Sequence, residues 1–225
     1  MKSRASRRAR SIVLAITVAA VAGAAGLTAI SMRGLIGRGS SDLAVLGEAP
    51  PFALVDTEGQ RFGSQELAGH AYVVHFFFTR CPSICPVHMQ SAKELAGLAA
   101  GRAAGAVTVV SITVDPEHDT PEVLRDYAGK VGAAAPTWRL LTGDRGAIVA
   151  FAEDGLKVPV GDAPAPGATA MDIAHTGRFV IVDGRGRIRG YYERSESRGM
   201  EPIFEDAVRV AAETGSAASH AREGG

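Results

Sequence analysis

The sequence predicts an α/β fold in which a central mixed sheet is flanked by helices. Residues 72–78 and 107–114 are nearly continuous apolar runs, as expected of strands that are covered on both faces. Near the carboxyl end, two apolar segments at 179–182 and 187–192 are joined by Asp-Gly-Arg-Gly at 183–186, which is typical of a β-hairpin. Strand–helix–strand units followed by a hairpin and a last helix are typical of a thioredoxin-like sandwich.

Local signals along the chain predict the remaining elements. The sequence Asp-Thr-Glu-Gly at 56–59 predicts a turn between two short strands. Thr120 followed by Pro121 predicts the start of a helix, because Thr caps a helix well and Pro fits its first position. The other expected elements are a helix at 87–100, a short strand at 138–141, a helix at 145–152, an exposed Pro- and Gly-rich segment at 158–170 and a closing helix at 200–213.

The amino-terminal segment predicts a membrane anchor. Residues 1–10 form a basic cytoplasmic segment, and residues 11–32 form a run of 22 residues without a charge. As a helix this run spans about 33 Å, slightly more than the hydrocarbon core of a bilayer, which is about 30 Å thick. A cleaved signal peptide is the alternative, because Ala-Val-Ala at 20–22 fits the small-residue cleavage pattern. Both alternatives place the following domain outside the cytoplasmic membrane.

Beyond the anchor, the sequence predicts a tether at 33–46, a folded domain at 47–213 and a disordered tail at 214–225. The whole chain has 24 basic and 24 acidic side chains, and residues 1–32 hold five of the basic ones and no acidic one. The remainder therefore carries 19 basic against 24 acidic groups. This acidic balance argues against nucleic-acid binding, which needs a basic surface. The presence of only two cysteines excludes a disulfide-rich scaffold and a four-cysteine zinc site.

The two cysteines, Cys81 and Cys85, follow directly after the most apolar predicted strand. In an open α/β sheet, the carboxyl end of a central strand is where binding sites are placed. Because the two thiols are four residues apart, both sulfurs can face one point. Such a pair can close a disulfide or hold a soft metal ion such as Cu(I). A structural disulfide or two inert buried thiols is the alternative.

A metal site needs a third donor, and His175 is the best placed of the six histidines. It precedes the expected strand 179–182, which a thioredoxin-like sheet sets beside strand 72–78. The imidazole can close a site of two sulfurs and one nitrogen, whereas the alternative role is that of a hydrogen-bonded histidine at a strand edge. His88 is a candidate auxiliary donor, and His75 is expected to be structural inside its strand.

Three segments of the chain resemble the hallmarks of a known family. They are Phe-Phe-Phe-Thr-Arg-Cys-Pro-Ser-Ile-Cys-Pro at 76–86, Ser-Ile-Thr-Val-Asp-Pro-Glu-His-Asp-Thr-Pro at 111–121 and His-Thr-Gly-Arg-Phe-Val-Ile-Val-Asp at 175–183. Together they resemble the SCO/SenC proteins, thioredoxin-like copper carriers of cytochrome c oxidase assembly. The resemblance extends over about residues 47–212. It implies that Cys81, Cys85 and His175 bind a copper ion, as Cu(I) or Cu(II).

Three positions depart from the family pattern. Phe77 stands where the family usually has Gly, Arg80 where it has His and Ser83 where it has Asp. A buried strand accepts Phe77, whereas Ser83 removes a negative charge beside the thiols and should change partner recognition. Thioredoxins carry a proline immediately before the strand that faces their cysteines, and residues 174–177 contain none. This loop offers a donor where a redox enzyme would hold substrate backbone.

The resemblance implies a membrane-tethered copper chaperone, rather than an enzyme, that delivers copper to the copper A centre of cytochrome c oxidase. Its expected partners are the copper A subunit, other copper chaperones or thiol reductases, and the membrane through residues 11–32. The expected location is the inner membrane, crossed once, with the domain on the periplasmic or extracytoplasmic side. A thiol–disulfide oxidoreductase that uses Cys81 and Cys85 without carrying copper is the alternative function; reduction of client thiols could also accompany copper carriage, because copper binding requires reduced thiols.

Overall fold

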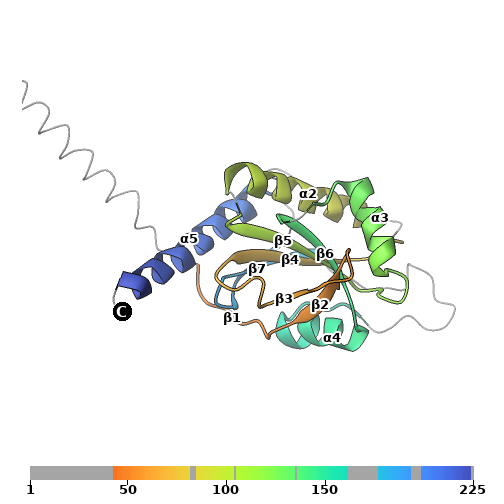
Figure 1. Cartoon of the computed structure of the whole chain (residues 1–225), viewed down its shortest axis with the longest axis horizontal. Helices are drawn as coiled ribbons and strands as arrows, with labels where there is room; N and C mark the ends of the chain where they lie inside the picture. Colours follow the sequence, from red (N-terminus) through yellow and green to blue (C-terminus); the bar gives the residue numbers. More distant parts are fainter. Residues whose placement is uncertain are drawn as a thin grey trace, which may run out of the picture. The chain divides into compact units, whose positions relative to one another are not determined.

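An eight-stranded mixed sheet forms the centre of the structure (Figure 1). The computed structural model describes residues 43–81, 85–103, 105–134, 136–161, 177–193 and 199–223, without the side chains of 85, 86 and 215–223. The strands are β1 (Gly47–Glu48), β2 (Ala53–Asp56), β3 (Arg61–Gly63), β4 (Ala71–Phe77), β5 (Val107–Thr113), β6 (Trp138–Thr142), β7 (Arg178–Val182) and β8 (Arg187–Glu193).

The strand order is β1-β8-β7-β4-β5-β6-β2-β3. β4, β5 and β6 are parallel to one another, and the other neighbouring pairs are antiparallel. All seven residues of β4 are buried, because this strand lies in the middle of the sheet with cover on both faces. The continuous apolar run that predicted it reflects this double burial. The prediction of a mixed thioredoxin-like sheet is confirmed.

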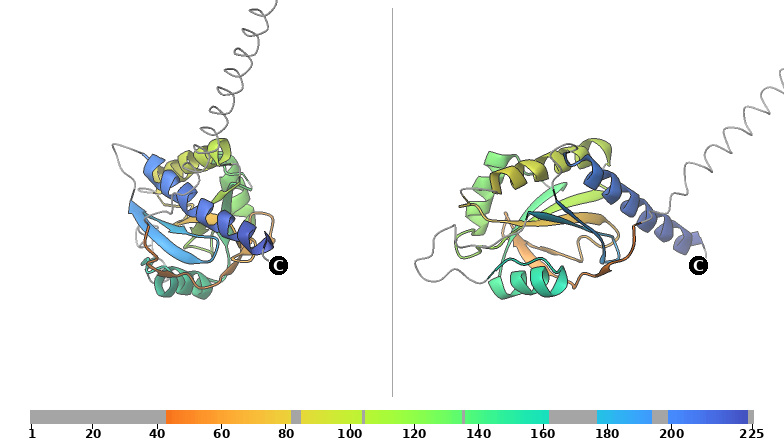
Figure 2. Two further views of the ribbon diagram at one scale, coloured as in Figure 1. Left: turned by 90° about the vertical axis from the view of Figure 1, so that its left-hand side faces the viewer. Right: turned by 180° about the vertical axis from the view of Figure 1, so that it is seen from behind.

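Helices cover both faces of the sheet. α2 (Cys85–Arg102), α3 (Pro121–Val131) and α5 (Glu201–Glu223) lie on one side, whereas α4 (Arg145–Val149) and the π-helical segment η1 (Ala150–Gly155) lie on the other (Figures 1 and 2). α3 begins as its sequence predicts: the Thr120 side chain accepts a hydrogen bond from the Val123 amide, and Pro121 occupies the first turn. Each face of the sheet is thus sealed by an apolar layer.

Four expectations differ from the structure. The predicted helix 145–152 becomes a short α4 followed by η1, whose wider turn, closed by the Leu156 amide donating to the Phe151 carbonyl, buries both side chains. The segment expected to be exposed from residue 158 starts buried: Val158 and Val160 have no exposed surface, and the Val160 amide donates to the Glu153 carboxylate. The rest of that segment, 162–170, lies outside the described residues.

The two ends of the domain also extend further than expected. Residues 43–46, expected in the tether, are bound to β8: the Leu46 amide donates to the Ile188 carbonyl, and the Arg189 guanidinium donates to the Leu43 carbonyl. At the other end, α5 continues to Glu223 in place of a disordered tail, because a helix that is already formed extends more easily than a new one starts. Within the described residues no helix is long and apolar enough to cross a bilayer, and the predicted anchor 11–32 lies outside them.

Candidate metal centre

Three segments of the chain meet at one edge of the sheet, where β4 and β5 end and β7 begins. β4 and β5 are parallel, so their carboxyl ends lie together. β7 is antiparallel to β4, with Val180 opposite Val74, and therefore enters the sheet towards the carboxyl end of β4. The loops at 78–81 and 114–120 and the entry residue Gly177 share this edge, which is where open α/β sheets bind ligands.

The first predicted ligand, Cys81, lies at this edge directly after β4. Its side chain is 8% exposed, and its amide donates to the Phe78 carbonyl at 3.4 Å. Cys85 is the first residue of α2, but its side chain is not among those described, and His175 lies outside the described residues. The structure therefore places the first thiol and the start of the helix that carries the second, and the convergence of the three donors stays a prediction.

Among the described side chains, no group of three His, Cys, Asp or Glu comes together as a metal site. The acidic side chains nearest in sequence to the edge, Asp115 and Asp119, are engaged in other contacts. The described side chains thus include one of the three predicted donors, Cys81, and completion of the site by Cys85 and His175 stays a prediction. Two thiolates with one imidazole form a donor set that suits copper.

The loop before Cys81 is held by a buried carboxylate. Asp119 has no exposed surface and accepts hydrogen bonds from the Thr79 amide at 3.0 Å, from the Thr79 hydroxyl at 2.5 Å and from the Thr113 hydroxyl. Burial raises the pKa of Asp119, although the hydrogen bonds from Thr113 and Thr79 favour its charged form. The contact ties the end of β4 to the end of β5, two residues before the first thiol.

A second carboxylate, Asp115, holds the residue next to Cys81. Its side chain is 1% exposed, and the Arg80 guanidinium donates to Oδ2 through Nε at 3.0 Å and Nη2 at 2.7 Å. The His118 Nδ1 lies 3.0 Å from Asp115 Oδ1 and 3.0 Å from Arg80 Nη2. Arg80, which departs from the family pattern, is thereby anchored, and its charge is balanced by Asp115.

His75 forms part of the buried wall behind the site. Its Nε2 lies 2.6 Å from the Ser111 hydroxyl, which also accepts a hydrogen bond from the Trp138 indole at 2.8 Å. Burial lowers the pKa of His75 to about 3, and the neighbouring His88 acts in the same direction. The imidazole is therefore neutral at physiological pH and has the structural role that its place in a strand predicts.

His88, the candidate auxiliary donor, lies in the first turn of α2 and is 7% exposed. Its ring meets the Phe179 ring edge to face, with centroids 6.3 Å apart and an interplanar angle of 72°. The ring also lies directly against the backbone of Gly177, where an added β-carbon would come within 2.0 Å of Cε1. The His88 ring therefore lies between its own helix and the chain segment that enters β7, in contact with both.

Asp115, Asp119, Thr79 and Thr113 are site-edge residues that the sequence did not predict. The contacts of Thr79 with Asp119 and of Arg80 with Asp115 join loops that are 40 and 35 residues apart, whereas Thr113 and Asp119 are only six residues apart. The available signal was position: Asp119 directly precedes the helix cap Thr120, in the second family-like segment. No periodic pattern marks such a residue, because its role depends on which strands become neighbours.

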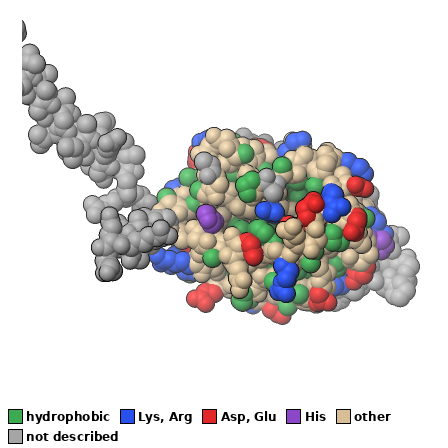
Figure 3. Space-filling view, in the orientation of Figure 1, with side chains coloured by type: hydrophobic (Ala, Val, Ile, Leu, Met, Phe, Trp, Pro, Cys, Tyr) green, Lys and Arg blue, Asp and Glu red, His purple; other side chains and the backbone are tan. Residues whose placement is uncertain are grey.

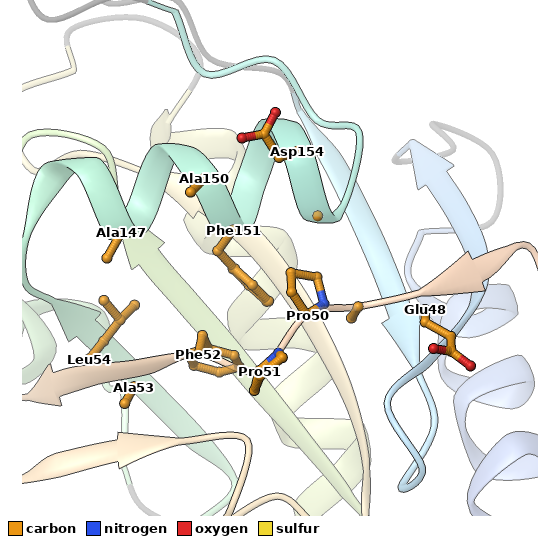
Figure 4. Close-up of a pocket in the computed structure, with 12 residues that line it drawn as sticks. Glu48, Pro50, Pro51, Phe52, Ala53, Leu54, Ala147, Ala150, Phe151 and Asp154 are labelled. Carbon is orange, nitrogen blue, oxygen red and sulfur yellow. The ribbon is translucent and has the colours of Figure 1, made fainter.

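One hollow in the surface lies apart from this edge. A hollow of about 660 Å³ is lined by residues of the segment 48–54 and of α4 and η1, among them Pro50, Phe52 and Phe151 (Figure 4). Its lining has no Cys or His, and its acidic members are Glu48 and Asp154, so it does not offer the donors that a copper ion prefers. On the face shown in Figure 3, basic and acidic side chains are interspersed.

Known proteins resemble this chain in sequence. An SCO2-like protein of Rickettsia prowazekii is 40% identical over 77 residues, which cover 34% of this chain and 37% of that protein. An SCO2-like protein of Rickettsia typhi is 38% identical over 82 residues, which cover 36% and 39%. The chain therefore spans well under half the length of these two relatives.

Solved structures resemble the fold over a longer stretch. BsSco, a member of the Sco family of cytochrome c oxidase assembly proteins in which a disulfide switch was identified, is 26% identical with a TM-score of 0.65, covering 78% of this chain and 98% of that one. ScoI of Bradyrhizobium japonicum, with copper bound, is 26% identical with a TM-score of 0.60, covering 72% and 99%.

The model of the family described as SCO1/SenC matches residues 44–211 of this chain. This range covers the sheet, both loops at the site edge and the first turns of α5. It agrees with the resemblance of the three sequence segments. The match extends over most of the chain, and we conclude that the chain belongs to the SCO1/SenC family.

Proposed function

We propose that this protein binds one copper ion through Cys81, Cys85 and His175 and delivers it during assembly of cytochrome c oxidase, at the copper A centre. The observation that carries the proposal is the strand arrangement. The parallel β4 and β5 and the antiparallel β7 direct the thiol loop and the segment after His175 to one edge of the sheet. The copper-bound ScoI of Bradyrhizobium japonicum, which has the same fold, supports it.

The chemistry of the site suits carriage of a soft ion. Two thiolates and one imidazole would suit Cu(I), and an ion with only three ligands would leave room for a thiolate of the client to displace one ligand at a time. Cys81 is nearly buried, and the ring of Phe179 in β7 has no exposed surface, so the site edge rests on an apolar wall. An apolar surrounding limits the access of water and of competing ligands to the ion.

The test is a copper titration of the reduced full chain without oxygen, followed by removal of loosely held copper with a competing chelator. We expect one copper per chain. Cys81→Ser and Cys85→Ser should each abolish tight binding, because one thiolate and one nitrogen leave a soft ion under-coordinated. His175→Ala should weaken binding strongly.

His70→Ala is the matched control, since His70 is exposed and lies on the loop before β4. Tight binding that survives in the double serine variant would refute the proposal.

Thiol–disulfide chemistry is the second candidate function, favoured by the disulfide switch identified in BsSco. When Cys81 and Cys85 form a disulfide, each thiol loses one proton and one electron, and an oxidant such as a client disulfide takes up both electrons. The disulfide has no thiolate to give, so the oxidised protein should bind no copper and regain binding after reduction. Equal copper binding by both forms would show that the cysteines are not the ligands.

The proposal includes a membrane tether. Residues 11–32 would hold the domain next to a membrane-bound client and raise its effective concentration there. Expression of the full chain followed by membrane fractionation and alkaline extraction tests this part. We expect the protein to stay in the membrane pellet, and release into the supernatant would refute the anchor.

A further inference from the structure

His88 stands between the two chain segments that have to bring the second sulfur and the imidazole together. It lies three residues after Cys85 on α2, and residues three apart in a helix share a face. On its other side, the ring contacts Gly177, which follows His175 by two residues. This placement suggests a role at the site that is separate from that of the ligands themselves.

The contact between His88 and Gly177 leaves no room for a side chain. A β-carbon on Gly177 would lie 2.0 Å from His88 Cε1 and 2.2 Å from Nε2. The φ angle of Gly177 lies outside the left-handed region, so the glycine is needed for space and not for backbone conformation. The chain can therefore approach the imidazole more closely at residue 177 than any other amino acid would allow.

The His88 ring is itself held in place by the core. It packs against the edge of Phe179, whose ring in turn lies 4.9 Å from the ring of His75. His75 is fixed by its contact with Ser111. The surface on which Gly177 rests is thus the end of a buried stack, which has little freedom to move.

We infer that His88 is a positioning residue of the proposed copper site: its ring fixes Gly177 and, through Gly177, the point at which His175 reaches the metal. The inference rests on the proposed function. Two residues span at most about 7 Å, so a displacement of Gly177 is passed on to His175. Metal–ligand distances tolerate a change of only about 0.2 Å. A β-carbon on Gly177, 2.0 Å from the ring, would have to move by about 1.4 Å to reach ordinary van der Waals contact, which begins at 3.4 Å.

The geometry favours positioning over ligation by His88. The edge of the imidazole that carries Nε2 and Cε1 is covered by the Gly177 backbone, and the Nδ1 atom would lie 3.2 Å from the added β-carbon. An aromatic ring without nitrogen can therefore replace His88 in the positioning role, whereas a ligand role requires the nitrogen. This difference makes the two roles separable by substitution.

The experiment compares copper affinity in the reduced full chain with Gly177→Ala, His88→Phe and the double variant Gly177→Ala/His88→Ala. Gly177→Ala should weaken copper binding about tenfold or more, as the loss of supporting contacts does at other metal sites. His88→Phe should bind copper as the unmodified protein does. The double variant should stay weakened, because it lacks the ring that fixes residue 177, even though the new methyl group then has room.

Gly190→Ala is the matched control. Its added β-carbon would also meet a ring, at 2.4 Å from Tyr192 Cε2, but it lies on β8, two strands away from β4. We expect unchanged copper affinity for this variant. The reduction potential of the Cys81–Cys85 pair should stay unchanged in Gly177→Ala, because a positioning role concerns the imidazole alone, whereas general loosening of the fold would shift it.

Three results would overturn the inference. They are unchanged copper affinity in Gly177→Ala, a double variant that binds copper as the unmodified protein does, and weakened binding in His88→Phe together with loss of a nitrogen coupling from the electron paramagnetic resonance spectrum of the Cu(II) form, which would make His88 a ligand. Failure of the proposed function is seen separately, since the unmodified protein would then bind no copper through Cys81, Cys85 and His175.

Discussion

Asp183 and Asp119 are two buried carboxylates that anchor opposite parts of the domain in different ways. Neither has any exposed surface, and each follows a strand. Asp183, after β7, pairs with the guanidinium groups of Arg187 at 2.7 Å and Arg189 at 3.2 Å. Asp119, in the loop after β5, accepts hydrogen bonds from an amide and two hydroxyls of Thr79 and Thr113 and has no cation among the partners that the structure describes.

The pKa values of the two groups move in opposite directions. For Asp183, burial alone would raise the pKa, but hydrogen bonds from the Arg187 side chain and from the Arg187 and Arg185 amides outweigh it, and the pKa is lowered. For Asp119, burial outweighs the hydrogen bonds from the threonines, and the negative Asp115 adds to the effect, so the pKa is raised. The hairpin of β7 and β8 is thus stabilised by a carboxylate whose charge is paired with arginines. The loop before Cys81 is held by uncharged donors around a carboxylate whose ionised form is disfavoured by burial.

The difference teaches how stability is distributed over the fold. The hairpin of β7 and β8 gains stability from its ionised anchor at neutral pH. The loop before Cys81 keeps its shape through hydrogen bonds to Asp119, a carboxylate whose charged form is disfavoured by burial. Groups whose pKa values are shifted by burial cluster at functional sites, where the position of a side chain matters more than its contribution to stability.

The largest expected effect is on the hairpin. Asp183→Ala removes the carboxylate that pairs with Arg189, whose side chain is 4% exposed, and leaves that buried charge with less compensation. We expect the free energy of unfolding in urea to fall by about 3 to 5 kcal/mol. Arg125→Ala is the control, because it breaks the exposed Arg125–Glu58 pair and should cost less than about 1 kcal/mol. Equal losses in the two variants would show that the buried network adds nothing beyond a surface ion pair.

The second expected effect is a smaller loss of stability that also affects the proposed copper site. Asp119→Ala leaves the Thr79 amide and two hydroxyls without their acceptor, and we expect a loss of about 3 kcal/mol of unfolding free energy. Copper affinity should fall as well, because the loop before Cys81 loses its tie to β5. Asp183→Ala should leave the copper affinity of the folded protein unchanged.

Asp144→Ala is the matched control for this variant. Asp144 caps α4 and accepts a hydrogen bond from the Ala147 amide at 2.8 Å, so its loss should cost about 1 kcal/mol without a change in copper binding. If Asp119→Ala retained the copper affinity of the unmodified protein, the tie would be structural only.

Much of this comparison could be predicted from the sequence for the hairpin and little for the loop. Asp183 opens the Asp-Gly-Arg-Gly turn, and the arginines that it binds lie four and six residues further along the chain. Local sequence therefore contains both the turn and its partners. The predicted strands at 179–182 and 187–192 and the parallel strands at 72–78 and 107–114 are confirmed to within one residue at each end.

The contacts at the site edge depend instead on tertiary neighbours. Thr79 and Asp119 meet only because β4 and β5 are adjacent and parallel. Gly177 and His88 meet across 89 positions of sequence, where no repeat or periodic pattern links them. The sequence could therefore place Cys81 directly after β4, where the structure has it, but it could not predict which side chains hold the neighbouring loops in position.

The third prediction tests the opposite pKa directions by pH. The Asp183 carboxylate stabilises the fold above its unfolded pKa of 3.8, and this contribution is lost as the pH falls through its lowered folded value. Asp119 behaves in the reverse way: its charge destabilises the fold as the pH rises above 3.8 through its raised folded value. The stability difference between the unmodified protein and Asp183→Asn should therefore shrink as the pH falls, and the difference from Asp119→Asn should change with the opposite sign.

Urea unfolding between pH 3 and pH 6 measures both differences, with a slope of at most about 1.4 kcal/mol per pH unit for one group. His75, whose pKa is lowered to about 3, also titrates towards this range, but it is present in all three proteins and cancels. Slopes of the same sign in the two variants would contradict the assignment of opposite shifts.

The smallest expected effect concerns Asp115, which lies between the two extremes because it has one guanidinium partner and one imidazole partner. The His118 side chain is 53% exposed, and its single Nδ1 can either donate to Asp115 or accept from Arg80 when the ring is neutral, but not both. His118→Ala should therefore lower the unfolding free energy by less than about 0.5 kcal/mol at pH 7. Arg80→Ala should cost more, since it removes both hydrogen bonds to a carboxylate that is 1% exposed. If His118→Ala proved as costly as Arg80→Ala, the imidazole would be the main counter-charge of Asp115, and the loop would be held by paired charge, as the hairpin is.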